Sequence, residues 1–266
     1  MSESDSVVHT ERDARDVLTI TLDRAGAANA MNDAMVEQLT AVLGAVAGDE
    51  SIRVVVLTGS GRTFCAGGDI SAMSAMSTWT RQQNLADSER FDGLFRMLDE
   101  CPHPVVCRVN GSAFGGGVGL VACADVAVAV DTASFALSEV RIGIIPAVVS
   151  TYVVPKLGVS WSRRMMLTGE RITATQALTL GLVHEVVHAE ELASRTAAVV
   201  DALLASDVRA QRRIKQHIIG SWQGTDAGRE RIAAAAVEAA TAARMSPEGA
   251  AGMSTFLDRS TRREQH

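Results

Sequence analysis

No run of 18 apolar residues occurs in this sequence, so it offers no segment long enough to cross a membrane as a helix. The segment 1–16 has neither the apolar stretch of a secretory signal nor the arginine-rich, acid-poor composition of a transit peptide. Basic residues are outnumbered, since 25 Lys and Arg against 31 Asp and Glu give a net charge of −6. That balance argues against general nucleic-acid binding, which needs a basic face. We therefore expect a cytoplasmic protein with no membrane and no nucleic-acid partner.

Cysteine is scarce, with four residues in a chain of 266. They show neither CxxC pairing nor the His/Cys spacing of a metal site, so we expect small buried thiols and no bound metal. The four are Cys65, Cys101, Cys107 and Cys123. Histidine gives no nucleophilic pattern either, because nothing near His103 or His184 in the sequence orients a triad. We expect both histidines to be structural.

What is present is ordinary for a globular protein, with 47% apolar and 21% charged residues. Apolar runs of strand length alternate with helical patterns, which predicts the α/β class. The expected strands are 17–22, 52–58, 105–109 and 126–130, and the expected helices are 32–46, capped by Asn32, and 81–98. From Ala189 onward the pattern becomes almost wholly helical. We therefore divide the chain into a core region 1–200 and a helical region 201–266.

The segment 109–125 carries the strongest chemical signal. An apolar strand ends at Asn110, and three consecutive glycines, 115–117, then open a short apolar helix. Glycine lets a ligand approach the backbone, and the first N–H groups of a helix have no internal partner. Such a turn can stabilise an oxyanion, but it can also bind phosphate or simply allow tight packing. A second turn of small residues at 64–70 also follows a strand, so two donors can meet at one oxygen.

With these two turns, the sequence resembles the crotonase family, the enoyl-CoA hydratase/isomerase superfamily. Five blocks carry the resemblance, in the family's order and with its spacing, and a weaker sixth lies near the C-terminus. They are 29–31, 64–70, 110–125, 135–146, 167–174 and 248–259. The resemblance implies a spiral of repeated ββα units and a C-terminal helical region used in trimer contacts. It also implies a homotrimer or a dimer of trimers.

The resemblance assigns catalytic roles residue by residue. Gly68 and Gly116 match the family's two oxyanion donors, and Glu139 matches the second of the two glutamates of its hydratases. The first glutamate matches Gly119, which cannot transfer a proton. Glu139 lies among apolar neighbours, and burial there would raise its pKa toward the range of a general acid/base. A surface or salt-bridged role for Glu139, near Arg141, is the structural alternative.

These residues suit more than one reaction. The motifs look closest to single-glutamate bacterial hydratases of the methylglutaconyl-CoA type, which makes an enoyl-CoA hydratase the leading hypothesis. A 3,2-enoyl-CoA isomerase using Glu139 as its sole proton shuttle is the alternative. A non-catalytic acyl-CoA binding protein is the alternative of another class, and Glu139 argues against it. The resemblance implies no cofactor, because coenzyme A is part of the substrate.

The same blocks imply the residues that bind the acyl-CoA. The turn at Cys65 and Ala66 should offer carbonyl groups to the adenine, and we expect Asp69 to cap or brace the following helix. The segment 71–84 should shape the acyl pocket. The apolar stripe of the helical tail should pack on the protein's own core or on another subunit, and the resemblance favours another subunit. The implied substrate-binding residues are Arg24, Arg62, Cys65, Ala66, Gly68, Asp69, Ile70, Gly115, Gly116, Gly119, Phe256 and Arg259.

Overall fold

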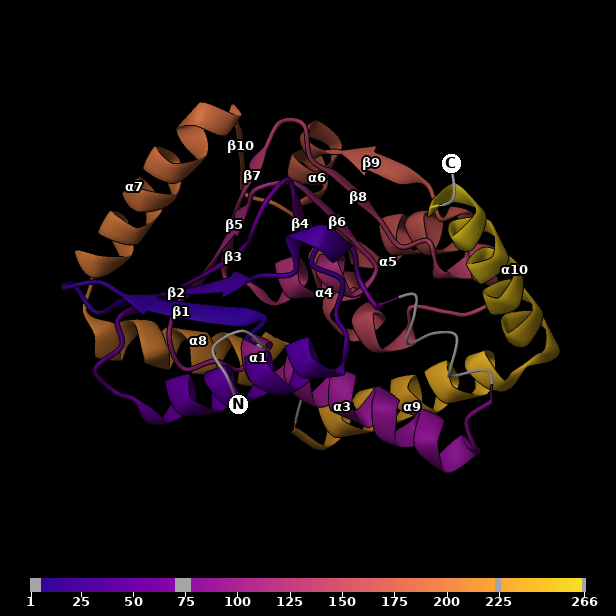
Figure 1. Ribbon diagram of the computed structural model, residues 1–266. Coiled ribbons are helices and arrows are strands. Elements are labelled where there is room, and N and C mark those ends of the chain that lie inside the picture. The colour runs from indigo at the N-terminus through magenta and orange to yellow at the C-terminus, as the bar shows by residue number, and fades with distance from the viewer. Residues whose placement is uncertain (1–5, 70–77, 223–225, 265–266) are drawn as a thin grey trace.

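The computed structural model describes residues 6–69, 78–222 and 226–264, and its strands form two sheets (Figure 1). In the described part of the chain, the larger sheet has six strands in the order β1-β2-β3-β5-β7-β10, and the smaller has four in the order β4-β6-β8-β9. The larger sheet contains β1 (Val8–Arg12), β2 (Val17–Leu22), β3 (Val54–Gly59), β5 (Val105–Val109), β7 (Val126–Val130) and β10 (Glu185–Val187). The smaller contains β4 (Thr63–Cys65), β6 (Ser112–Phe114), β8 (Ser134–Ala136) and β9 (Arg171–Thr173).

The strands are arranged in a repeat. In each unit a first strand joins the larger sheet and the second strand joins the smaller one, as in β3–β4, β5–β6 and β7–β8. Within each sheet these successive strands pair in parallel. Each unit therefore advances both sheets by one strand, which is the ββα spiral that the resemblance implied, and the α/β prediction is confirmed.

Burial explains why the central strands are apolar throughout. All six residues of β3 are buried, as expected for a parallel strand with both faces covered. One face packs against α7 (Leu192–Leu204), whose Val200 contacts Val54 and Val56 of β3 in a small hydrophobic cluster. The opposite face belongs to the main core, which includes Val55 and Leu57. The strand predicted at 52–58 thus begins two residues and ends one residue further along the chain than expected.

Local sequence signals fix where the first long helices begin. Asn32 caps α1 (Asp33–Gly48), and its side chain accepts a hydrogen bond of 3.0 Å from the Met35 N–H. Thr80 and Gln83 form a capping box at the start of α3 (Arg81–Asp99). Both helices were predicted, and both lie within two residues of the expected limits. The short helix after the glycine triplet is α4 (Gly116–Cys123).

The C-terminal helices share the core of the protein. They are α8 (Val208–Trp222), α9 (Asp226–Met245) and α10 (Pro247–Glu264), and they follow α7. The division at residue 200 falls inside α7. Val237 and Ala240 of α9 belong to the same hydrophobic cluster as the sheet residues, and α9 packs on α3 and α5 (Ala147–Thr168). Much of the apolar stripe of the tail therefore packs on this chain itself, although Ile232 and Met245 remain exposed.

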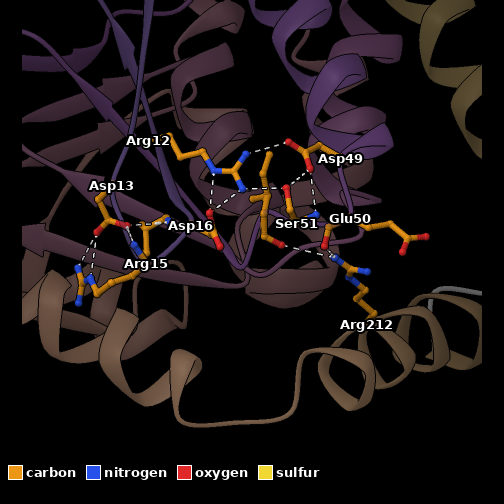
Figure 2. Close-up of polar contacts among 10 residues, drawn as sticks. Arg12, Asp13, Arg15, Asp16, Asp49, Glu50, Ser51 and Arg212 are labelled. Atoms are coloured by element: carbon orange, nitrogen blue, oxygen red, sulfur yellow. Dashed lines mark hydrogen bonds and ion pairs between the residues drawn. The ribbon is translucent and has the colours of Figure 1, made fainter.

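Polar contacts bind α8 to the rest of the fold (Figure 2). Arg212 donates to the Glu50 carbonyl at 2.8 Å, beside the turn that joins α1 to β3. In the same region Arg12 of β1 bridges Asp16 and Asp49 at 2.7 and 3.0 Å. Lys215, one turn further along α8, pairs with Asp125 at 2.7 Å. These contacts anchor the helix by charge and hydrogen bonding.

The two histidines expected to be structural hold the backbone in place. The Nε2 atom of His103 lies 3.0 Å from the Val46 carbonyl oxygen, and Nδ1 of His184 accepts from the Ala127 N–H at 3.0 Å. The four cysteines are buried and free, as predicted. Among the described residues, no group of His, Cys, Asp and Glu has the arrangement of a metal site. None of the described helices is both long and apolar enough to span a membrane.

The last helix, α10, packs on a 3-10 turn, η3 (Glu139–Ile142). The contact is between backbones. A side chain at Gly252 of α10 would collide with the Ile142 carbonyl, and one at Gly143 would collide with the carbonyl of Glu248. Gly143 also has φ of +74°, a conformation that other residues rarely adopt. Glycine at these positions lets α10 lie directly on the turn that carries Glu139.

Candidate active site

A cavity of about 90 Å³ lies where the two glycine-rich turns, α3, η3, the start of α5 and α9 meet. Its lining combines an apolar wall with a small set of charged side chains. The lining residues are Met31, Asp33, Gly68, Asp69, Asp87, Arg90, Phe91, Phe95, Gly116, Glu139, Ile144, Ile145, Pro146, Ala147, Val148, Val149, Ala240 and Arg244. Concave, mostly apolar sites with a few convergent polar groups are typical ligand sites.

The first turn leaves one N–H group free. Met31 pairs with this turn as an isolated parallel bridge, its N–H donating to Gly67 at 2.7 Å and its carbonyl accepting from Asp69 at 3.1 Å. In a parallel bridge of this kind, the residues on either side of Gly68 bind Met31. The N–H of Gly68 itself therefore faces away from Met31. Among the described residues, no acceptor binds it. Gly68 lines the cavity, so this donor is available to a ligand.

The second turn provides another free donor. Gly115, at φ +50°, donates to the Ala136 carbonyl at 2.9 Å and ends β6. Val118 and Gly119 donate back to Gly115, whereas the N–H of Gly116, the first residue of α4, binds no described acceptor. A Cβ on Gly67 would lie 3.4 Å from the Gly116 nitrogen, so the two turns are in contact. The predicted pair of oxyanion donors is thus brought together.

Glu139 lies beside these donors. A Cβ on Gly115 would lie 3.0 Å from Oε1 of Glu139, which places the carboxyl group against the second turn. Its Oε2 is buried, with no hydrogen-bond partner among the described residues. Burial raises the pKa of Glu139 from its ordinary value of 4.5 to about 7. Arg141 is exposed, and among the described residues no ion pair joins it to Glu139.

Gly119 packs against two residues of the cavity wall. A Cβ at this position would lie 2.9 Å from the ring of Phe95 and 3.2 Å from Val149. Phe95 and Val149 line the cavity, whereas Gly119 is not part of its lining. Contact of Gly119 with the acyl group stays a prediction. The glycine makes room for an aromatic ring at the position where hydratases of the resembled family carry their first glutamate.

Asp69 and Arg24 form an ion pair near the cavity. The guanidinium of Arg24 lies 2.8 Å from Asp69 and donates to the Ala30 carbonyl at 2.5 Å. Both side chains are largely buried, with 21% and 10% of their surface exposed. This pair connects the block at 29–31 with the first glycine turn, so Asp69 braces that turn, and its predicted role at the following helix concerns residues outside the described ranges.

The remaining residues predicted to contact CoA do not line the cavity or lie outside the described residues. Arg62 is exposed, Cys65 is fully buried with its carbonyl facing Gly117, and Ala66 donates to Ala28 at 3.0 Å. Ile70 and the methionines of 71–77 lie outside the described residues. Phe256 and Arg259 belong to α10, but their side chains lie outside the description. For all of these, binding to CoA stays a prediction.

Sequence reasoning missed the wall that α3 and α9 provide. Asp87, Phe91 and Phe95 recur every four residues, so they lie on one face of α3. The signal was present as a helical repeat, but such a stripe is equally typical of core packing. From α9 come Ala240 and Arg244, also four residues apart. Only the packing of α9 on α3 shows that both faces border one cavity.

The charged part of this wall is an ion-pair cluster. Asp87 receives Arg90 at 2.7 Å on one oxygen and Arg244 at 2.7 Å on the other. Only 3% of its side-chain surface is exposed. Arg90 also reaches the exposed Asp33 at 2.6 Å. The cavity therefore joins a buried acid/base group and two free backbone donors with a buried carboxylate held between two guanidinium groups.

This arrangement suits reactions that pass through an anion on oxygen. Two residues with N–H groups that bind no described acceptor line one cavity, and a carboxyl group with a pKa of about 7 beside them can take up and release a proton. A thioester carbonyl needs both when its neighbouring carbon is deprotonated or its double bond is attacked. The described residues of the cavity hold no cysteine or serine that could act as a nucleophile.

Comparison with known proteins agrees with this geometry. A family model described as "Enoyl-CoA hydratase/isomerase" matches residues 12–263. Enoyl-CoA hydratase AKT6-1 of Alternaria alternata is 37% identical over 172 residues, which make up 65% of this chain but only 56% of that protein. The 1,2-epoxyphenylacetyl-CoA isomerase of Escherichia coli strain K12 is 34% identical over 76% of this chain and 78% of its own. A crystal structure of enoyl-CoA hydratase from Mycobacterium smegmatis has a TM-score of 0.80 at 31% identity and covers 96% of this chain and 97% of its own.

Proposed function

Because the chain belongs to the enoyl-CoA hydratase/isomerase family, we propose that it adds water across the 2,3 double bond of an enoyl-CoA thioester. The observation that carries this proposal is the position of Glu139 beside the free N–H groups of Gly68 and Gly116. Its buried carboxyl group supplies a base and then an acid, and the two donors bind the thioester oxygen. The relative from Alternaria alternata, named an enoyl-CoA hydratase, supports the same reaction.

In this mechanism the Glu139 carboxylate takes a proton from water as the water oxygen forms a bond to C3. The electron pair of the double bond moves toward C1, and the thioester oxygen becomes an enolate oxyanion held by Gly68 and Gly116. Each such donor is worth about 3 kcal/mol in comparable sites. The protonated Glu139 then returns the proton to C2, which restores the carbonyl and the carboxylate. A single carboxyl group is sufficient for both transfers, so the loss of the first glutamate at Gly119 does not prevent the reaction.

Finer features belong to the same proposal. The motif resemblance favours a branched or glutaconyl-type acyl group, as in methylglutaconyl-CoA hydratases. It also favours a homotrimer or a dimer of trimers in the cytoplasm. No cofactor is required, because coenzyme A enters as part of the substrate. Ile232 and Met245 of α9, exposed in the single chain, are candidates for the subunit contact.

Isomerisation of a 3-enoyl-CoA to a 2-enoyl-CoA is the second candidate. The observation that favours it is that Phe95 and Val149, not a second carboxyl group, border the cavity next to Gly119. Moving a proton from C2 to C4 needs one carboxylate and an oxyanion site, and no bound water. One relative is named an isomerase, of 1,2-epoxyphenylacetyl-CoA. A non-catalytic acyl-CoA binder is the third reading, and the unpaired, buried Glu139 argues against it.

Ultraviolet absorbance of the conjugated enoyl thioester distinguishes the hydratase, the isomerase and the non-catalytic binder. Loss of absorbance with crotonyl-CoA or a glutaconyl-CoA supports hydration, whereas a gain with a 3-enoyl-CoA supports isomerisation. Tight CoA binding without either change would favour the binder and overturn the enzyme proposal. Glu139→Gln is the matched negative control for both reactions, and Glu11→Gln, on the exposed side of β1, controls for the substitution itself.

A further inference from the structure

We propose that Arg244, oriented by Asp87, binds a carboxylate at the end of the acyl chain remote from the thioester. The substrate class would then be an enoyl-CoA whose acyl group ends in a carboxylate. The thioester end of this substrate rests on the proposed function. The terminal carboxylate is inferred from the ion-pair cluster of α3 and α9.

Arg244 has more hydrogen-bond donors than acceptors around it among the described residues. A guanidinium group carries five N–H donors and no acceptor. Among the described residues, Arg244 has a single acceptor, Oδ2 of Asp87 at 2.7 Å. Its side chain is 15% exposed and lines the cavity. The remaining donors thus belong to a largely buried cation in the cavity wall.

In the buried part of this cluster, the guanidinium groups of Arg90 and Arg244 share one carboxylate, that of Asp87. Arg90 has two further, exposed partners, Asp33 at 2.6 Å and Glu37 at 3.9 Å. Asp69, which also lines the cavity, pairs with Arg24. Arg244 pairs with Asp87 alone in the part of the chain that the structure describes, so an anionic group can complete its coordination.

The two polar ends of the cavity lie at different heights along α3. A Cβ on Gly116 would lie 3.5 Å from the Phe95 ring, so the oxyanion turn lies at the level of Phe95. Asp87 precedes Phe95 by two turns, which is about 12 Å along the helix axis. Phe91 lies between them on the same face, and Ala240 lies on the facing helix. An acyl chain running from the oxyanion turn along this apolar wall would extend toward Arg244, whose long side chain also lines the cavity.

Specificity follows from the cost of leaving Arg244 without an acceptor. A site built around a buried polar group discriminates strongly against an analogue that lacks the matching group. A carboxylate can accept two parallel hydrogen bonds from a guanidinium, whereas a methyl group accepts none. We therefore expect a marked preference for a chain with a terminal carboxylate over an uncharged chain of equal length.

The test compares 2,3-dehydroadipyl-CoA with 2-hexenoyl-CoA, which have the same chain length and differ in the terminal carboxylate. In the unaltered protein, kcat/KM for the first should exceed that for the second by about 10-fold or more. Arg244→Met should remove this preference, because it should lower kcat/KM for dehydroadipyl-CoA far more than that for hexenoyl-CoA. Arg81→Gln is the matched control, because Arg81 forms an exposed α3–α9 ion pair with Glu238 away from the cavity lining.

Binding of the saturated analogues separates this inference from the proposed function. Adipyl-CoA should bind more tightly than hexanoyl-CoA by calorimetry, and Arg244→Met should abolish the difference, whether or not the protein hydrates enoyl-CoA. Equal affinities in the unaltered protein would overturn the carboxylate site. Absence of turnover with Arg244-dependent binding would overturn only the hydratase. Melting temperatures of the variants exclude unfolding, and Arg244→Lys, which keeps the charge, should retain part of the preference.

Discussion

The ring of Phe95 packs against the Cα of Gly119, at a distance that leaves no room for a side chain there. The two residues come from α3 and α4, so this contact also sets how closely the two helices approach. In this structure the absence of a side chain at position 119 and the placement of the Phe95 ring therefore depend on each other. The result is a cavity with a single acid/base group and an apolar wall opposite it.

Replacing Glu139 with Gln keeps the size of the side chain and removes its proton transfer. We expect kcat to fall about 100-fold or more, as for other general acid/base groups, with little change in CoA affinity. Steady-state kinetics and calorimetric binding of CoA measure the two effects. Retention of most of the activity would eliminate the single-carboxylate mechanism.

The rate of hydration should depend on pH through Glu139. The carboxylate is the form that takes a proton from water, so activity should rise as pH increases through about 7 and then level off. The profile of kcat/KM between pH 5 and 9 reports the pKa of the free enzyme. A flat profile would mean that another group limits the reaction, and a profile that falls with pH would mean that the acid form reacts first.

The same group should destabilise the folded protein at alkaline pH. Its folded pKa of about 7 exceeds the ordinary value of 4.5, so the native state binds the proton more tightly than the unfolded state. Below pH 4.5 Glu139 does not lower the free energy of unfolding. Above that pH the loss of stability grows until about pH 7, where it reaches about 3 kcal/mol. Glu139→Gln should therefore raise the free energy of unfolding at pH 8 and leave it nearly unchanged at pH 4.5. Urea denaturation at both pH values tests this, and equal effects would contradict it.

Side chains at position 119 should be tolerated poorly. Gly119→Ala places a methyl group 2.9 Å from Phe95, and overpacking of this kind costs about 1–3 kcal/mol of stability. Gly119→Glu should lose activity on short linear and branched enoyl-CoA alike. Adding Phe95→Ala should restore part of the stability and let the new carboxylate reach the cavity. Gly93→Ala in α3, where no atom lies within 4 Å of the new methyl group, is the control and should not destabilise.

If the double variant gained hydration of crotonyl-CoA over Phe95→Ala alone, position 119 would be competent for a second carboxylate. If Gly119→Ala proved as stable as the unaltered protein, the close contact with Phe95 would not determine the residue at this position.

The contact of α10 with η3 should be needed for catalysis. Gly252→Ala forces a methyl group against the Ile142 carbonyl, which should displace the turn that carries Glu139. We expect kcat to fall about 10-fold or more, because small displacements of catalytic groups are costly. Ala251→Ser, at the exposed neighbouring position, should have no effect. Deleting the chain from Glu248 onward should lower kcat, CoA affinity and oligomer stability together, which sedimentation and CoA titration measure. A truncated chain that keeps all three would show that α10 is only a local cover.

Much of the fold was predictable because its signals are local. Strand β2 matches its predicted limits, and Asn32 caps α1 through a short-range hydrogen bond. Gly68 and Gly116 stood out because glycine-rich turns after strands are recognisable, and Glu139 was assigned only by its match to the resembled family; the catalytic roles of all three stay predictions. The structure brings all three to one cavity.

The far end of the cavity was not predictable, because it arises from long-range packing. Arg244 and Asp87 are distant in sequence, and neither has a motif around it. The packing around Gly119 was not predictable for the same reason, since the Phe95 ring beside it comes from another helix. The apolar stripe of the tail was assigned to a neighbouring subunit, although Val237, Ala240 and Met253 are buried within this chain.

The backbone contact between Gly252 and Ile142 also affects when the protein can become active during its synthesis. The two glycine turns and η3 leave the ribosome well before α10 does, and contacts between segments so far apart in sequence form late in folding. A nascent chain can thus bury its sheets and still hold Glu139 on an unsupported turn. Ribosome-bound intermediates that lack α10 should therefore contain a folded core without a completed catalytic turn.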